Sequence, residues 1–203
     1  MLKLQERIAD NYSLKYHHLQ AKEYDIALWE AFLKGDQQAF GLLFKNNYAH
    51  LFQYGSKICR NMPLLEDTIQ ELFLEIWKSR NPVPTLSVRA YLLKALKYKL
   101  LKEFARNNTA SLQDDLADDS FFDLGHEAFL IEKQEDEERS QKLMLSLQQL
   151  SHRQKEIIYL KFYQNLSYEE VSAIMNINYQ AARNLLYHAI KALKKIIQLA
   201  VLI

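Results

Sequence analysis

Residues 176–195, NINYQAARNLLYHAIKALKK, carry side chains whose chemistry suits contact with DNA. Arg, Asn and Gln present donors and acceptors that match base edges in the major groove, and cations pair with phosphates. No acidic residue occurs between Tyr179 and Lys195. The candidate DNA-contacting residues are Asn178, Tyr179, Gln180, Arg183, Asn184, Tyr187, His188 and Lys191.

Capping residues predict the elements that would position these side chains. Ser167 and Glu170 have the spacing of a capping box, which predicts the start of a short helix. Asn176 can end that helix in the left-handed conformation, and Asn178 can cap the next helix. A short helix, a tight turn and a longer helix are the order of a helix-turn-helix. Because every amphipathic helix has a polar face, a plain helical hairpin would show the same pattern.

Apolar spacing indicates how these helices pack. The predicted buried stripe of the last helix is Ala182, Leu185, Leu186, Ala189 and Leu193. An earlier capping box, Ser151 with Gln154, predicts another helix start. Its expected apolar residues are Ile157, Ile158, Leu160 and Phe162.

A second candidate DNA-contacting segment is the basic helix predicted over residues 87–108. Cations beside aromatic rings suit single-stranded DNA, because rings stack on bases while cations pair with phosphates. The candidates are Arg89, Lys94, Lys97, Tyr98, Lys99, Lys102 and Arg106. An amphipathic helix whose aromatics belong to the core would look similar. We assign Tyr91 and Phe104 to the core, and Tyr98 to stacking because lysines surround it.

The preceding segment, EDTIQELFLEIWKSR (66–80), reads as an acidic amphipathic helix. Its apolar side is predicted to hold Ile69, Leu72, Phe73, Ile76 and Trp77, and Asp67, Gln70, Glu71 and Glu75 line another side. Pro63 is expected to break the chain before this helix. Upstream, a helix over 25–34 and a second from Ala39 to Tyr54 are separated by Gly35, a stop, and Asp36, an N-cap.

Composition predicts an all-α protein that is not an enzyme. Gly (4) and Pro (3) are scarce, and no segment alternates like a strand. The lone Cys59 cannot form an internal disulfide, and no apolar run approaches a membrane span, which predicts a cytoplasmic protein. No metal-spaced His/Cys cluster, phosphate loop or nucleophile elbow occurs, so we expect no catalytic residue, metal or cofactor. Asp67 and Glu71, one turn apart, fit an exposed protein contact better than acid–base catalysis.

Charge divides the chain into four parts. Residues 1–24 form an unassigned extension, 25–106 a first helical domain, 107–140 a linker, and 141–203 a second domain. The linker holds two basic and eleven acidic residues, a net charge of −9, and its acid runs, such as 134–138, suit a solvated segment. It could be an ordinary linker, or a tether that occupies or screens a basic surface. It could also draw the two basic domains together and mask both DNA faces.

Taken together, these segments resemble the extracytoplasmic-function (ECF) sigma factors of the sigma-70 family. The resemblance covers residues 25–195. It rests on DIALWEAFLKGDQQAFGLLFKNNYAHLF with its GD-x-x-AF turn, on the D-x-x-QE-x-F helix, on SVRAYLLKALKYKLLKEFARN, and on the C-terminal segment from LQQLSHRQ to IKALKK. Four such motifs in this order and at this spacing are far more specific than any one of them.

The resemblance implies an RNA polymerase sigma factor with two small helical domains, region 2 and region 4. The acidic helix would bind the clamp helices of the largest core-polymerase subunit through Asp67, Gln70 and Glu71, with Phe73 and Trp77 in support. The basic helix would melt and read the promoter −10 element, and the C-terminal helix-turn-helix would read the −35 element. The linker would thread toward the RNA exit path, and an anti-sigma factor is an expected partner.

Several positions depart from the family pattern. Lys97-Tyr98 stands where an Arg-Asn pair is usual, so a −10 base would be stacked rather than gripped. Leu185 stands where many members have Arg, and Asn176 where many have Gly, a combination similar to members from Bacteroidetes-type bacteria. Two other functions remain compatible with parts of the sequence. One is a stand-alone helix-turn-helix regulator with a helical sensor domain, and the other is a helical adaptor that binds only proteins.

Overall fold

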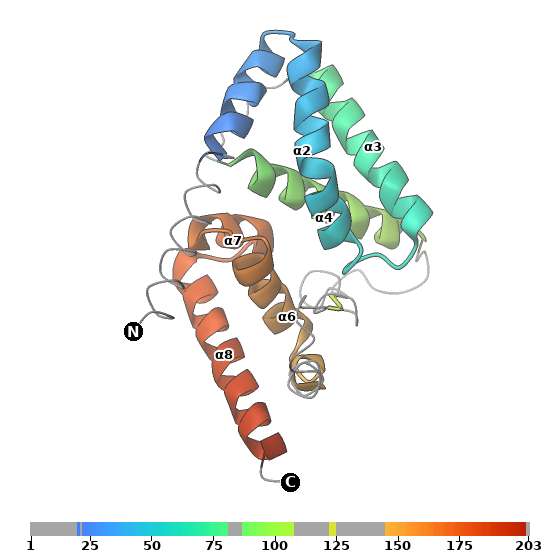
Figure 1. Ribbon diagram of the computed structural model, residues 1–203. Coiled ribbons are helices and arrows are strands. Elements are labelled where there is room, and N and C mark those ends of the chain that lie inside the picture. Colours follow the sequence, from blue (N-terminus) through green and yellow to red (C-terminus); the bar gives the residue numbers. More distant parts are fainter. Residues whose placement is uncertain (1–19, 21, 81–86, 108–121, 125–144, 202–203) are drawn as a thin grey trace, which may run out of the picture.

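All regular structure in the part of the chain that the computed structural model describes is helical. The described residues are 20, 22–80, 87–107, 122–124 and 145–201. They form two bundles, shown in Figure 1, and the all-α prediction is confirmed. The N-terminal bundle comprises the helix over residues 22–33, α2 (Gln37–Gly55), α3 (Met62–Ser79) and α4 (Val88–Asn107). The C-terminal bundle comprises a short helical turn over 145–148, α6 (His152–Ile158), the π-helix η2 (Tyr159–Tyr163), α7 (Tyr168–Met175) and α8 (Tyr179–Val201).

The turn before α2 forms as its sequence predicts. Gly35 has φ +99°, a conformation that residues with a Cβ rarely adopt. The Asp36 side chain then accepts hydrogen bonds from the Gln38 and Ala39 amides, at 2.8 and 3.1 Å, and caps α2.

α3 starts earlier than predicted. The prediction placed its first residue at 66 and treated Pro63 as a break, but the helix begins at Met62 with Asn61 as its N-cap. Pro63 lies in the first turn, where a helix needs no amide donor, so proline is tolerated there. The helix ends at Ser79, and the next residue, Arg80, caps it in the left-handed conformation with φ 41°.

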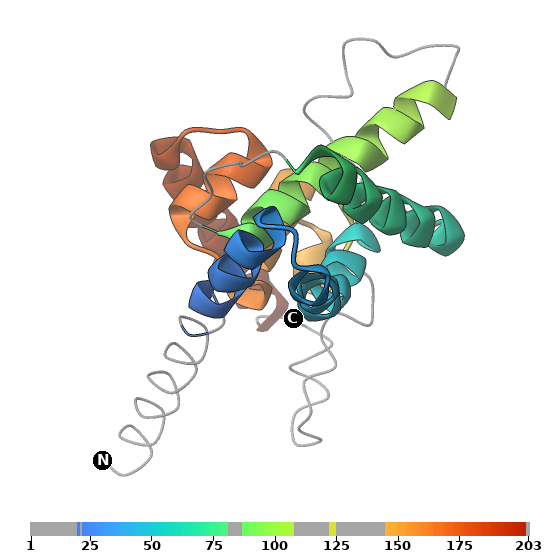
Figure 2. The same ribbon diagram turned by 90° about the horizontal axis from the view of Figure 1, so that it is seen from above.

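α4 lies across α2 and α3, as Figure 2 shows from above. Its start is capped by Ser87, whose hydroxyl accepts from the Ala90 amide at 3.3 Å. Gly55, at the end of α2, sits where the helices approach most closely. A Cβ at this position would clash with a Leu65 methyl group and lie 3.3 Å from Leu96. Glycine here therefore permits the close crossing of helices that holds α4 in place.

The predicted caps of the C-terminal bundle are confirmed. Both capping boxes, Ser151 with Gln154 and Ser167 with Glu170, are closed in both directions. Asn176 ends α7 in the left-handed conformation with φ 53°, and the Asn178 side chain accepts from the Ala181 amide at 2.7 Å. α7 and α8 thus form the predicted helix-turn-helix.

One predicted core residue of this bundle is wrong. Phe162 was expected among the buried apolar residues, but it is 61% exposed. The cause is η2, in which the Gln164 amide bonds to the Tyr159 carbonyl at 3.1 Å, five residues back. The wider turn rotates the side chains that follow relative to an α-helix, so Phe162 leaves the stripe.

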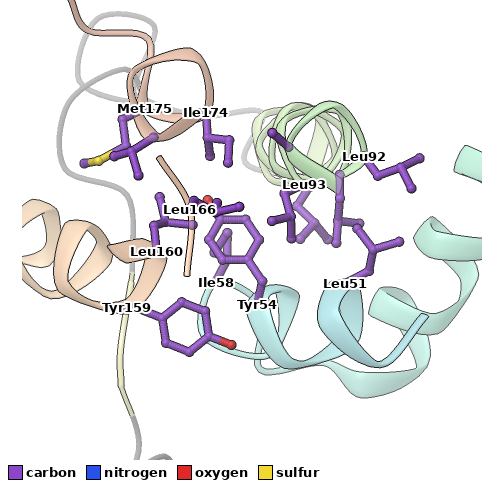
Figure 3. Packing of buried hydrophobic residues seen from close by; sticks show 14 of the residues in the cluster. Leu51, Tyr54, Ile58, Leu92, Leu93, Tyr159, Leu160, Leu166, Ile174 and Met175 are labelled. Atoms are coloured by element: carbon purple, nitrogen blue, oxygen red, sulfur yellow. The ribbon is translucent and has the colours of Figure 1, made fainter. Parts of the chain in front are cut away.

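The two bundles pack directly against each other. α7 lies under α4 in Figure 1, and the two helices are in contact. The buried apolar residues of both bundles form one continuous cluster. Figure 3 shows its centre, where Tyr54, Ile58 and Leu93 of the N-terminal bundle meet Tyr159 and Leu160 of the C-terminal bundle.

The linker prediction is wrong at two residues. Residues 122–124 lie inside the expected solvated stretch, yet Phe122 is 0% exposed and Leu124 4%. The Phe122 ring lies 5.9 Å from the Tyr54 ring and 5.6 Å from the Tyr159 ring, so it contacts both bundles. The acid run 134–138, residues 1–19 and the last two residues lie outside the described part of the chain.

Candidate nucleic-acid interface

The N-terminal half of α8 presents its predicted DNA-contacting face to solvent. This face, which we call the reading face, consists of Asn178, Tyr179, Gln180, Arg183, Asn184, Tyr187, His188 and Lys191, and all eight residues are exposed. The opposite side is anchored, because Ala182 and Ala189 are 0% exposed and Leu186 is 4% exposed. Leu185 and Leu193 are partly buried and pack on the same cluster. The predicted division of α8 into a buried stripe and a polar face is therefore confirmed.

Contacts within the reading face orient several of its side chains. The Gln180 amide donates to the Asn184 side-chain oxygen at 3.1 Å, one turn along the helix. The Arg183 guanidinium lies 5.9 Å from the centre of the Tyr179 ring, which itself packs edge-on against Tyr168 at 5.7 Å. Arg183 keeps its planar donors exposed and available for a bidentate contact.

The predicted DNA face of α4 is divided between solvent and the other bundle. Tyr98 is 49% exposed, with the Lys94 ammonium 6.0 Å from its ring centre, and Lys102 and Arg106 are exposed. Lys99 instead pairs across to α3, with Glu75 at 2.8 Å and more loosely with Glu71 at 3.7 Å. Arg106 pairs with Glu103 on its own helix at 3.0 Å.

Lys97 and Arg89, two of the predicted DNA contacts, point toward the C-terminal bundle. The Lys97 ammonium, with a side chain only 12% exposed, donates to both carboxylate oxygens of Glu156, at 2.7 and 3.0 Å. Arg89 lies between the bundles: burial lowers the pKa of its guanidinium, while the charges of Asp25 and Glu170 oppose that shift. In this arrangement Lys97 is not available to DNA, and Arg89 is partly buried.

Three buried residues that the sequence reasoning missed complete this junction. Glu156 is 1% exposed and also accepts from the Tyr54 hydroxyl at 2.6 Å. Burial, followed by the neighbouring Glu156 charge, raises the pKa of Tyr54 well above its ordinary value, so its hydroxyl stays a donor. Across the same junction, Gln164 accepts from His50 at 3.1 Å. The one available signal was Glu156 itself, an acid within the apolar run of α6.

The acidic side of α3 is exposed as predicted. Asp67, Gln70 and Glu71 face solvent, and Leu74, which the prediction omitted, is 55% exposed one turn further along. Its spacing from Asp67, seven residues, would have placed it on this side. Of the two predicted supporting residues, Phe73 is buried at 4% exposure, whereas Trp77 is partly buried and packs against Phe40. Both belong to the aromatic core under the acidic side.

The described residues contain neither a metal-binding cluster nor a membrane-spanning helix. No three His, Cys, Asp or Glu side chains among them gather at metal-binding distance. No helix in the described ranges is both long and apolar enough to cross a membrane.

Comparisons with known proteins match these surfaces to a family. The family model for sigma-70 region 4 matches residues 140–193, which include α7, the turn and the reading face of α8. The chain is also similar to the ECF RNA polymerase sigma factor SigK of Mycobacterium ulcerans (strain Agy99), with 21% identity over 170 residues that cover 83% of this chain and 90% of the relative. The chain thus resembles sigma-70 region 4 in its C-terminal bundle and an ECF sigma factor over most of its length.

Solved structures share the fold of this chain. CnrH in complex with the cytosolic domain of CnrY matches with a TM-score of 0.55 at 20% identity, over 86% of this chain and 97% of that chain. The sigma factor RpoE from Bartonella quintana, in complex with the anti-sigma factor NepR, matches with a TM-score of 0.50 at 15% identity, over 78% and 96% of the two chains. The predicted all-α fold with two helical domains is thus confirmed.

Proposed function

We propose that this protein is a transcription initiation factor that binds RNA polymerase core and directs it to specific promoters. The observation that carries the proposal is the reading face of α8, which is exposed, free of acids and set by a capped turn within the region that matches sigma-70 region 4. An exposed helix face with this chemistry is what major-groove reading requires. In this role the reading face contacts the −35 element.

The N-terminal bundle supplies the other contacts in this proposal. The exposed side of α3, Asp67, Gln70, Glu71 and Leu74, binds the clamp helices of the largest polymerase subunit, with Phe73 and Trp77 as its support. On α4, Tyr98 stacks on an unpaired −10 base and Lys102 pairs with phosphates. Region 2 comprises residues 25–106 and region 4 comprises residues 141–203. An anti-sigma factor binds the protein in the cytoplasm and keeps it inactive until a signal releases it there.

Transcription from defined components tests the function. We expect the purified protein to direct core polymerase to a subset of promoters in a genomic pool, measured by run-off transcription. A stand-alone regulator or an adaptor would support no transcription with core alone, so an inactive mixture would contradict the proposal.

Capture of core polymerase tests the α3 surface. Asp67→Lys combined with Glu71→Lys reverses the charge of the acidic side, and we expect it to abolish capture. The matched control is Glu23→Lys combined with Glu30→Lys, which makes the same charge change at exposed positions of the helix over 22–33. If both double variants lose capture equally, net charge rather than the α3 surface governs binding.

A further inference from the structure

A buried carboxylate joins the two bundles at the point where α4 is predicted to meet DNA. Glu156 of α6 accepts from Lys97 of α4 and from Tyr54 of α2, and its side chain is 1% exposed. A carboxylate that binds the Lys97 ammonium takes the place a DNA phosphate would have. As long as the bundles stay packed, Lys97 has a partner and cannot pair with the promoter.

A second carboxylate contacts the start of α4. Glu170, the capping-box residue of α7, pairs with Lys22 of the first helix at 2.8 Å. It also accepts a hydrogen bond from Ser87, directly before α4. Arg89, the second residue of α4, is partly buried and lies within the influence of the same carboxylate. Contacts at the start and in the middle of α4 therefore hold the C-terminal bundle against it.

The linker segment 122–124 closes the junction from a third side. The Phe122 ring packs against both Tyr54 of α2 and Tyr159 of η2, and the Phe122 carbonyl accepts from the His152 ring at 2.8 Å. The next amide, Asp123, donates to the Lys57 carbonyl at 2.8 Å. One hydrogen bond goes to each bundle, so this segment, which we call the clasp, ties the two bundles together.

This packed arrangement cannot span a promoter. α7 contacts α4 on one side and α8 on the other, and packed helix axes lie about 8–10 Å apart, so α4 and α8 are roughly 20 Å apart beside α7. Elements at −10 and −35 are separated by about 25 base pairs, or ~85 Å along the duplex at about 3.4 Å each. Neither helix exceeds about 35 Å in length at ~1.5 Å per residue, so their lengths do not close the gap.

The chain between the bundles is long enough for the open form. The tether from residue 108 to residue 144 reaches ~120 Å when extended at about 3.3 Å per residue, which exceeds the promoter distance. Separation of the bundles therefore needs only the loss of the junction contacts.

We propose that the packed arrangement is an autoinhibited state that the clasp keeps closed. The clasp and the Glu156–Lys97 pair must release before the two DNA-contacting helices reach their elements together. The inference rests on the proposed function, because the promoter is what the closed state excludes. It adds that the free protein restrains its own promoter engagement.

The test uses the full chain with Phe122→Ala. The substitution lies outside the helices, so each bundle keeps its fold, which circular dichroism checks. We expect small-angle scattering to show a radius of gyration near 17 Å for the wild type, as for a compact chain of this length, and a clearly larger value for the variant. The concentration needed for half-maximal run-off transcription should fall at least about tenfold, because apparent affinity scales with the competent fraction.

Glu30→Gln is the matched control for the second variant, Glu156→Gln, because it makes the same exchange of a carboxylate for an amide at an exposed position of the helix over 22–33. We expect wild-type behaviour in both measurements. Glu156→Gln is the second variant: it removes the charge that holds Lys97 while keeping an acceptor, and it should move both readouts in the same direction as Phe122→Ala.

Distinct results overturn the inference. A wild-type protein that is already expanded in solution would show that the closed state is not the free state. Expansion of Phe122→Ala with no change in the transcription dose would show that closure does not inhibit. Failure of the proposed function looks different, because then neither wild type nor variant transcribes at any concentration while scattering still reports closure.

Discussion

The two helices that we propose to contact DNA are built in different ways. The reading face of α8 is fully exposed, and its buried stripe packs within its own bundle. One face of α4 packs within its own bundle, and a second face packs against the C-terminal bundle. Among its predicted DNA contacts, only Tyr98, Lys102 and Arg106 are exposed. The proposed −35 surface is thus fully exposed in this arrangement, whereas the proposed −10 surface is only partly exposed. Substitutions on α4 and on α8 test this difference.

The largest effect is expected at Glu156. In Glu156→Ala the Lys97 ammonium and the Tyr54 hydroxyl lose their buried partner, which should lower the free energy of unfolding by about 3–5 kcal/mol. Urea unfolding followed by circular dichroism measures it. Glu75→Ala removes an exposed partner of Lys99 and serves as the control, with a change of about 0–1 kcal/mol. Equal effects of the two variants would mean that the Glu156 site is no more than a surface pair.

Arg183→Ala should separate reading from stability. We expect weaker binding at the −35 element by ~1–3 kcal/mol if Arg183 makes a bidentate contact to guanine. Stability should change by less than about 1 kcal/mol, because its contact with Tyr179 is exposed. Run-off transcription on −35 variants measures the first quantity and urea unfolding the second. Unchanged promoter preference would remove Arg183 from the reading face.

Tyr98 provides the corresponding test on α4. Loss of a base-stacking ring in Tyr98→Ala should cost a similar ~1–3 kcal/mol in binding a single-stranded −10 probe, whereas Tyr98→Phe keeps the ring and most of the affinity. Fluorescence anisotropy of the holoenzyme with the probe measures both variants. If Tyr98→Phe and Tyr98→Ala weaken binding equally, the hydroxyl group rather than ring stacking matters for binding. The proposal that stacking on Tyr98 replaces a hydrogen-bonded contact from Asn is then wrong.

The smallest effect is expected in how the free energy of unfolding depends on pH. Burial opposes the charge on Glu170, but hydrogen bonds from Lys22 and Ser87 outweigh it and lower its pKa. A carboxyl group with a lower pKa in the folded state stabilises that state above its unfolded pKa of about 4.3, and the contribution is lost as pH falls through the folded value. The stability difference between wild type and Glu170→Gln should therefore be present at pH 7 and shrink below about pH 4. A difference that is constant with pH would contradict this role of Glu170.

Local signals predicted the C-terminal bundle well, because caps act over three or four residues. The hydrogen bonds of Ser151, Ser167 and Asn178 and the left-handed Asn176 involve only near neighbours, so spacing alone revealed them. The errors came where a local rule has two outcomes. Pro63 can break a helix or begin one, and the neighbours of Phe162 can form an α-turn or a π-turn.

The prediction of a fully solvated linker was wrong because it also rested on a rule with more than one outcome. A net charge averaged over 107–140 predicts solvation, but burial is decided residue by residue, and Phe122 and Leu124 are apolar enough to leave the water. FFDLG within the acidic stretch contained that information. The site that buries Phe122 is made by two rings that are distant in sequence, and it exists only when both bundles have formed.

The sequence by itself determined the helices, their caps, the polar face of α8 and the acidic side of α3, because periodicity and capping depend on residues a turn or two apart. Only the tertiary structure decided which cations of α4 remain free. Lys97 and Glu156 lie 59 positions apart, and Lys22 and Glu170 148 apart. No periodic pattern links residues so distant, and a buried carboxylate finds its cation only when packing brings the two helices together.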